Sequence, residues 1–180
     1  EDLEHCGGGG RLPHAAPAMV SARAKRRGLT QLGTLGSGHC VQIQIVDEIY
    51  DAEAAAAMGL HQVGRVCVVI HCGSRGLGHQ VATDYLQMFE AGMKVVGMVL
   101  PDRHVACAPV GSTEGHAYFQ AMNAAGNFAF CNRSVLASRV RNAFEDVFQY
   151  SARDLGLYTV YDVCHNLAKV EVHQLDGEGR

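Results

Sequence analysis

The 180-residue sequence predicts a domain that mixes helices with β-strands, of the α/β or α+β class. Residues 40–46 (CVQIQIV) alternate apolar and polar side chains, as a strand with one buried face does. Residues 66–70 (VCVVI) form a short β-branched run of strand length. Helix-forming segments separate and follow these strands, and no fixed-period repeat interrupts them. The pattern leaves the order of the strands open.

The first half of the chain contains two further predicted elements. Residues 1–30 read as a polar and basic lead-in: a glycine run at Gly7–Gly10 and a Pro-containing stretch precede a short helix over Val20–Arg27. Residues 47–58 are rich in alanine, which favours a helix, and Gly59 is a suitable stop. We therefore expect a strand, a helix and a second strand between residues 40 and 70.

The second half is predicted from capping residues and apolar periodicity. Ser112 and Thr113 are suitable N-caps for a helix toward Asn123, and Ser134 for another. The remaining predicted elements are a helix over His79–Ala91, a strand over Val105–Val110 and a last strand over Leu157–Val163. The length and composition of the chain fit one globular domain or a piece of a larger one.

Composition narrows the environment but not the partner. No apolar run reaches membrane-spanning length and the acidic start is unlike a secretory signal, so we expect an intracellular protein without a membrane partner. Seven cysteines without a Cys-x-x-Cys spacing are expected to be reduced. The net charge of −3 leaves nucleic-acid binding open, because residues 23–27 (RAKRR) are locally basic. Such a run is also typical of a solvated helix face.

A glycine-rich turn follows the second strand. Residues 73–78 (GSRGLG) combine glycines, which allow close backbone approach, with the planar charged fork of Arg75. This composition suits a phosphate site. The simpler interpretation is a tight strand-to-helix turn with a solvated arginine. The spacing matches neither a Walker loop nor the dinucleotide-binding fingerprint.

Three histidines lie at the margins of predicted strands: His39, His71 and His165. Imidazole is a common ligand for transition metals, and ligands from neighbouring strand ends converge easily. The pattern therefore favours a metal site, although each histidine on its own is more often structural.

Several longer motifs carry a family resemblance. They are LGTLGSGH (32–39), VDEIYD (46–51), IHCGSRGLGHQVATD (70–84), DRHVACA (102–108), AAGNFAFCNRS (124–134) and DVCHNLAKVE (162–171). In this order and spacing the chain resembles the RtcB family of GTP-dependent RNA-splicing ligases, and its eukaryotic members most. The resemblance runs along essentially the whole chain.

The resemblance implies a fold and an activity. The fold is α+β, a mixed sheet with interspersed helices, of which residues 31–180 would be an incomplete central part. Family members join RNA ends with a 3′-phosphate or 2′,3′-cyclic phosphate to a 5′-hydroxyl end. They use GTP, two manganese ions and a guanylate carried on a histidine. The implied partners are tRNA exon halves, archease and the subunits of the tRNA ligase complex, in the cytoplasm and nucleus.

The resemblance also implies roles for individual residues. By motif position, His39, His71 and His165 match metal ligands, whereas Arg27 and Arg75 match arginines that hold RNA or nucleotide phosphates. Gln42 and Asn166 would be neighbours of the nucleotide site.

The chain departs from the family pattern in places. Gly38 directly precedes His39 where the family has an intervening asparagine, and Gln42 replaces a glutamate; both changes bear on nucleotide binding. No histidine here matches the guanylated one, and the upstream aspartate and cysteine ligands have no counterpart. The resemblance therefore implies an internal fragment without a catalytic residue, which alone would not complete ligation.

Three hypotheses remain open at this point. The chain is a segment of an active ligase, a shortened or diverged paralogue that binds metal or RNA without catalysis, or a structural remnant. A middle portion of a larger domain leaves apolar surface exposed, so we expect marginal stability in isolation.

Overall fold

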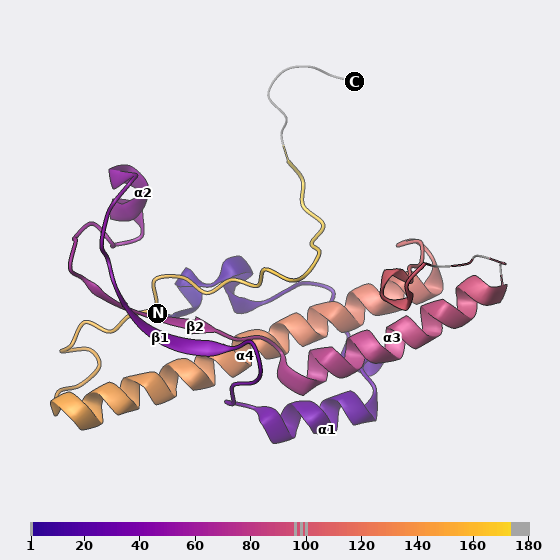
Figure 1. Ribbon diagram of the computed structural model, residues 1–180, viewed down its shortest axis with the longest axis horizontal. Coiled ribbons are helices and arrows are strands. Elements are labelled where there is room, and N and C mark those ends of the chain that lie inside the picture. Colours follow the sequence, from indigo (N-terminus) through magenta and orange to yellow (C-terminus); the bar gives the residue numbers. More distant parts are fainter. Residues whose placement is uncertain (1, 96, 98, 100, 174–180) are drawn as a thin grey trace, which may run out of the picture.

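The computed structural model describes residues 2–95, 97, 99 and 101–173. A two-stranded ribbon lies at one end of a layer of helices, in which the long α4 runs the length of the molecule (Figure 1). The helices are α1 (Ala22–Gln31), α2 (Ala52–Ala57), α3 (Arg75–Val95) and α4 (Thr113–Phe148), and the strands are β1 (Cys40–Ile45) and β2 (Val66–His71). Short 3₁₀ turns cover Asp2–His5, Gly7–Gly10, Pro17–Met19 and Arg103–Val105. The α+β class is confirmed.

The described sheet is smaller than the mixed sheet we expected. β1 and β2 pair antiparallel, with Cys40 opposite His71. Among the described residues, parallel pairing is limited to an isolated bridge between Cys6 and Asp162. One face of the ribbon, here called the apolar ribbon face, exposes Ile43, Ile45 and Val66. The register matters for function because it sets His71 beside the residue that follows His39.

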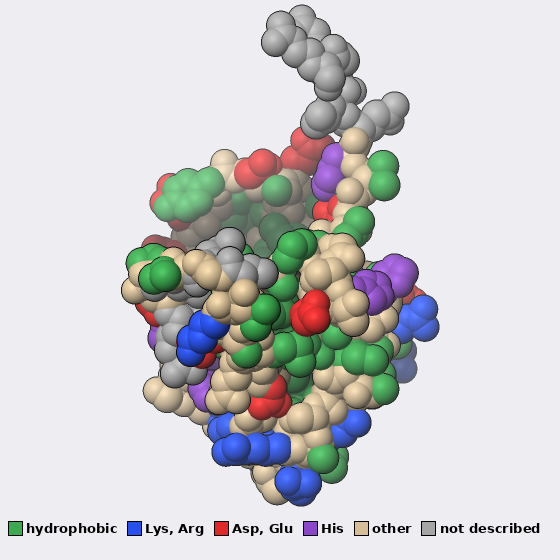
Figure 2. Space-filling model, turned by 90° about the vertical axis from the view of Figure 1, so that its right-hand side faces the viewer, with side chains coloured by type: hydrophobic (Ala, Val, Ile, Leu, Met, Phe, Trp, Pro, Cys, Tyr) green, Lys and Arg blue, Asp and Glu red, His purple; other side chains and the backbone are tan. Residues whose placement is uncertain are grey.

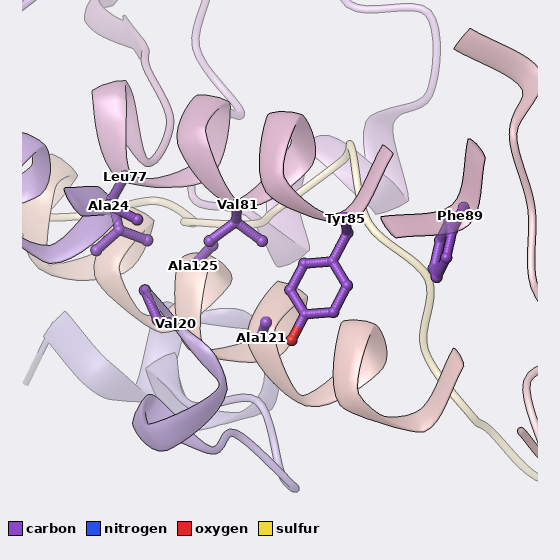
Figure 3. Packing of buried hydrophobic residues seen from close by; sticks show 8 residues of the cluster. All are labelled: Val20, Ala24, Leu77, Val81, Tyr85, Phe89, Ala121 and Ala125. Atoms are coloured by element: carbon purple, nitrogen blue, oxygen red, sulfur yellow. The ribbon is translucent and has the colours of Figure 1, made fainter. Parts of the chain in front are cut away.

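The core lies between the helices rather than against the ribbon. α1 and α4 both pack on α3 (Figure 3), and the buried cluster comprises Val20, Ala24, Leu77, Val81, Tyr85, Phe89, Ala121 and Ala125. The hydroxyl of Tyr85 donates to the Met19 carbonyl at 3.0 Å, so this core aromatic keeps a partner for its polar end. Val20 and Ala24 thus share one core with α3 and α4. The boundary near residue 30 stays a prediction.

The two helices predicted after residue 112 are one. Ser112 caps α4 as predicted, because its Oγ accepts a hydrogen bond from the Gly115 N–H at 3.0 Å. Ser134, predicted to begin a second helix, instead donates to the Phe130 carbonyl one turn earlier, at 3.0 Å. Although α4 has 36 residues, neither it nor another helix among the described residues is apolar enough to cross a membrane.

Three further predictions need correction. The helix predicted over 47–58 covers only Ala52–Ala57, because Asp51 Oδ1 caps it by accepting from the Glu53 and Ala54 N–H groups. The strand predicted over Val105–Val110 is absent, since the Cys107 N–H turns to the sulfur of Met93 instead of a neighbouring strand. The strand predicted over Leu157–Val163 is reduced to the Cys6–Asp162 bridge, the one strand-like pairing that the described residues offer it.

Candidate functional site

The three histidines singled out from the sequence come together at one end of the ribbon. The ring centres of His71 and His165 are 5.1 Å apart, and those of His39 and His71 are 6.3 Å apart. All three line a cavity of about 280 Å³, whose floor is formed by residues of α3 and α4. Three segments far apart in the sequence therefore deliver imidazoles to one space.

Local structure explains how His39 and His71 meet. A turn precedes β1, in which Gly38 has φ +77° and the His39 N–H donates to the Gly36 carbonyl at 2.9 Å. A side chain at Gly38 would strain this backbone, so glycine suits the position. β1 then starts at Cys40, opposite His71 at the end of β2. The antiparallel register therefore brings together two histidines that are 32 positions apart.

The surroundings of His39 favour the neutral imidazole. Burial is the main influence that lowers the pKa of His39, and the positive charge of Arg75 and the neighbouring His71 add to it. The Nδ1 atom of His39 lies 3.6 Å from the Sγ atom of Cys72. A neutral ring keeps a nitrogen lone pair free to accept a proton or bind a metal ion.

Arg75 holds an unusual backbone position beside this cluster. It begins α3 with φ 52°, a left-handed conformation uncommon outside glycine. Its Nε donates to the Thr34 hydroxyl at 3.2 Å, and a side chain at Gly36 would collide with its guanidinium. The hydrogen bonds of Arg75 to described residues involve Nε alone. Its two terminal nitrogens have no hydrogen-bond partner among the described residues and lie close to Gly36, where they could donate to an anion. Arg75 itself is not among the residues that line the histidine cavity.

The glycine-rich turn predicted over residues 73–78 is shorter than expected, because most of it is helical. Gly76 and Gly78 belong to the first turn of α3, which begins four residues earlier than predicted. The Gly76 N–H is taken by the Gln31 side chain at 2.9 Å, and a Cβ at Gly76 would lie 2.7 Å from that same oxygen. This glycine allows α1 to approach α3 closely. The Gly76 N–H is therefore not free to bind an anion, and phosphate binding by this stretch stays a prediction.

The other predicted site residues are divided. Asn166 lines the histidine cavity. Arg27 instead points to the interface of α1 and α3, where its Nη1 donates to Gln80 at 2.8 Å. Gln42 is exposed on β1 and accepts a hydrogen bond from Gln44 at 3.0 Å. Neither Arg27 nor Gln42 lines the cavity as it stands.

The donors fit a metal ion in part. Two imidazoles on one ion, with bonds of about 2.1 Å, have ring centres roughly 5 Å apart, which matches His71 and His165. Within the described residues, no three histidine, cysteine or acidic side chains are grouped closely enough to enclose an ion. A metal ion at these histidines would therefore need further ligands, such as water, phosphate oxygens or other protein groups.

Two residues of this site were missed from the sequence. Asn132 and Arg133 lie in the middle of α4, where they are 0% and 8% exposed and contact the segments that carry the histidines. The sequence placed them in a gap between two helices, so nothing marked them as buried. Continuous helical periodicity through Ser134 was the signal that could have found them.

The basic cluster of α1 lies on the surface. Arg23, Lys25 and Arg26 are exposed, and Figure 2 shows lysine and arginine side chains gathered along the lower side of the molecule, where α1 lies in Figure 1. In the structure this basic run forms a solvated helix face, one of the two interpretations that the sequence left open. The run forms an exposed positive surface on α1, the helix that precedes His39 in the chain.

Comparisons with known proteins place the chain in a family. The profile of the family described as tRNA-splicing ligase RtcB matches residues 1–179. The tRNA-splicing ligase RtcB of Archaeoglobus fulgidus is 51% identical over 178 residues, an alignment that covers 98% of this chain and 37% of that relative. The chain thus spans little more than a third of the length of the curated relative it matches. On this evidence, the chain belongs to the RtcB family of tRNA-splicing ligases.

Proposed function

We propose that this chain supplies the metal- and phosphate-binding face of an RNA ligase of tRNA splicing. The reaction joins an RNA 3′-phosphate or 2′,3′-cyclic phosphate end to a 5′-hydroxyl end, with GTP and manganese. Family membership supports the ligase class, and the observation that carries the proposal for this chain is the convergence of His39, His71 and His165 on one cavity.

The side chains suit that chemistry. The imidazole nitrogens of His71 and His165 would hold Mn²⁺, and the lowered pKa of His39 favours a neutral ring that could join them. The two terminal nitrogens of Arg75 have no hydrogen-bond partner in the described part of the chain, and a guanidinium fork suits a phosphate. A bound Mn²⁺ supplies a Lewis acid that stabilises charge on phosphate oxygens and lowers the pKa of an attacking hydroxyl. Asn166 adds an amide at the cavity wall for hydrogen bonds to the RNA end.

Calorimetric titration of the 180-residue chain with Mn²⁺ at neutral pH tests the metal part. The chain should bind Mn²⁺, and the double variant His71→Ala, His165→Ala should lose that binding. The matched control is His61→Ala, His116→Ala, which removes two exposed histidines outside the cavity and should bind as wild type does. Equal binding by both double variants would overturn the metal role of the cavity.

A second function is favoured by the position of Gln42. This residue replaces an acidic one of the family and is turned to Gln44 on the exposed ribbon, away from the histidines. A diverged paralogue that binds metal or RNA without catalysis would tolerate this. The two functions separate when RNA halves bearing a 2′,3′-cyclic phosphate and a 5′-hydroxyl are incubated with the protein, GTP and Mn²⁺. Joined RNA supports the ligase, whereas bound but unjoined RNA supports the non-catalytic alternative for this chain.

A further inference from the structure

The segments that carry His71 and His165 are held by a single side chain from α4. The guanidinium of Arg133 donates from Nη1 to the carbonyl of Cys72 at 3.2 Å and from Nη2 to the Sγ atom of Cys164 at 3.3 Å. Cys72 directly follows His71, and Cys164 directly precedes His165. Arg133 therefore bridges the immediate neighbours of the two imidazoles whose ring centres are 5.1 Å apart.

The third nitrogen of Arg133 fixes the guanidinium in place. Its Nε donates to Asp162 Oδ1 at 2.5 Å, and the guanidinium carbon lies 4.8 Å from the ring centre of Phe130. The backbone of Asp162 is held as well, because its N–H donates to the His5 carbonyl and its carbonyl accepts from the Gly7 N–H. All three kinds of nitrogen in the side chain are thus occupied, which only the planar fork of arginine can achieve.

Asn132 does the same for the turn on the His39 side. Its Oδ1 accepts from the Gly33 N–H at 2.6 Å, and its Nδ2 donates to the Gly73 carbonyl at 3.1 Å and to the Cys72 sulfur at 3.2 Å. The side chain is completely buried. Two consecutive residues of α4 therefore hydrogen-bond to the turn before His39 and to the immediate neighbours of His71 and His165.

We propose that Asn132 and Arg133 are positioning residues that set the spacing of the histidine cluster, with Arg133 fixing His71 against His165. This inference deepens the proposed function and rests on it for the meaning of that spacing. A buried charge is expensive to place in a core, and it is retained here at the point where two histidine-bearing segments must meet.

The test separates positioning from simple structural support. Arg133→Lys keeps a positive charge opposite Asp162, but an ammonium lacks the planar fork that bonds to both the Cys72 carbonyl and the Cys164 sulfur. Arg133→Met removes charge and fork together. The matched control is Arg141→Lys, an arginine of the same helix whose guanidinium pairs with Asp2 and Thr159, away from the cavity.

The readout is the nuclear Overhauser contact between the rings of His71 and His165 in the metal-free chain, followed by Mn²⁺ titration of the same samples. Wild type and Arg141→Lys should show the ring contact, whereas Arg133→Lys should be folded, lose the contact and bind Mn²⁺ at least tenfold more weakly. Arg133→Met should lose the contact as well, and its thermal midpoint should also fall.

Each outcome decides the proposal. An Arg133→Lys variant that keeps both the ring contact and wild-type Mn²⁺ affinity would overturn it, because charge neutralisation of Asp162 would then be the whole role of Arg133. Absence of the ring contact in wild type would overturn it too. A wild-type chain with the contact but without Mn²⁺ binding would remove the proposed metal role, while the effect of Arg133 on the contact would still stand.

Discussion

The crossing of α1 and α3 is close enough that a single methyl group should be felt. Gly28 of α1 is buried against α3, and a Cβ built there lies 2.9 Å from both Cβ and Cδ1 of Leu77 and 3.3 Å from Phe128. The Cβ of Leu77 is tied to the helix backbone, so relief requires the helices to separate. We expect Gly28→Ala to force that separation, which would also disturb the Gln31–Gly76 contact at the start of α3.

The magnitude follows from two opposing terms. Overpacking a well-packed core costs about 2 kcal/mol, within the range measured for such changes. Alanine in place of glycine inside a helix returns about 1 kcal/mol of helix propensity. The net loss in the free energy of unfolding is then about 1 kcal/mol. For a chain of this size it lowers the thermal midpoint by roughly 3 °C.

Gly92 gives the matched control. It lies on the exposed side of α3, and a Cβ there meets no atom within 4 Å. Gly92→Ala should therefore show only the propensity gain, up to about 1 kcal/mol of added stability. Both variants are measured by thermal unfolding monitored by far-ultraviolet circular dichroism. If Gly28→Ala stabilised the chain as much as Gly92→Ala does, the close approach of α1 to α3 described here would be wrong.

Three other outcomes are expected. Hydrogen bonds from Arg141 lower the pKa of Asp2 from its ordinary value of 3.8. The Asp2–Arg141 pair therefore stabilises the fold fully at pH values above 3.8, and this stabilisation is lost as the pH falls through the lowered pKa. Asp2 is half exposed, and Asp2→Asn should cost less than about 1 kcal/mol at neutral pH and nothing in strong acid, measured by urea unfolding; an equal cost at both would contradict this. Gly36→Ala should push the Arg75 guanidinium away and move the pKa of His39 back toward 6.5 in a nuclear magnetic resonance titration. An unchanged pKa would mean that the charge of Arg75 does not act on His39. The apolar ribbon face should bind a hydrophobic dye, and thermal unfolding of the isolated chain should be broad. A sharp cooperative unfolding transition without dye binding would refute marginal stability.

The sequence was sufficient where a local rule decides the structure. Alternation over residues 40–46 predicted β1, the β-branched run predicted β2, and Ser112 predicted the start of α4. The three histidines could be singled out because each lies at the margin of a strand predicted from the sequence. Only the register between β1 and β2, which the sequence does not state, decides that His39 and His71 are neighbours.

The failures have physical causes that lie outside local pattern. Ser134 has the chemistry of a cap, but its hydroxyl bonds back into the helix, and this hid the buried Asn132 and Arg133. The phosphate-binding role that the family resemblance implies for Arg27 stays a prediction; in this structure its guanidinium contacts Gln80, because α1 packs that side of its surface on α3. Burial of a polar side chain depends on which helix passes over it, and single-sequence periodicity does not report that.

The most direct test of the central claim uses the paramagnetism of Mn²⁺. Substoichiometric Mn²⁺ is added to the chain with histidine rings labelled with ¹⁵N, and the broadening of each ring signal is followed. We expect the signals of His39, His71 and His165 to broaden first, while those of the exposed His61 and His116 stay sharp. Uniform broadening of all ring signals, or broadening that begins at the exposed histidines, would contradict a metal-binding histidine cluster in this cavity.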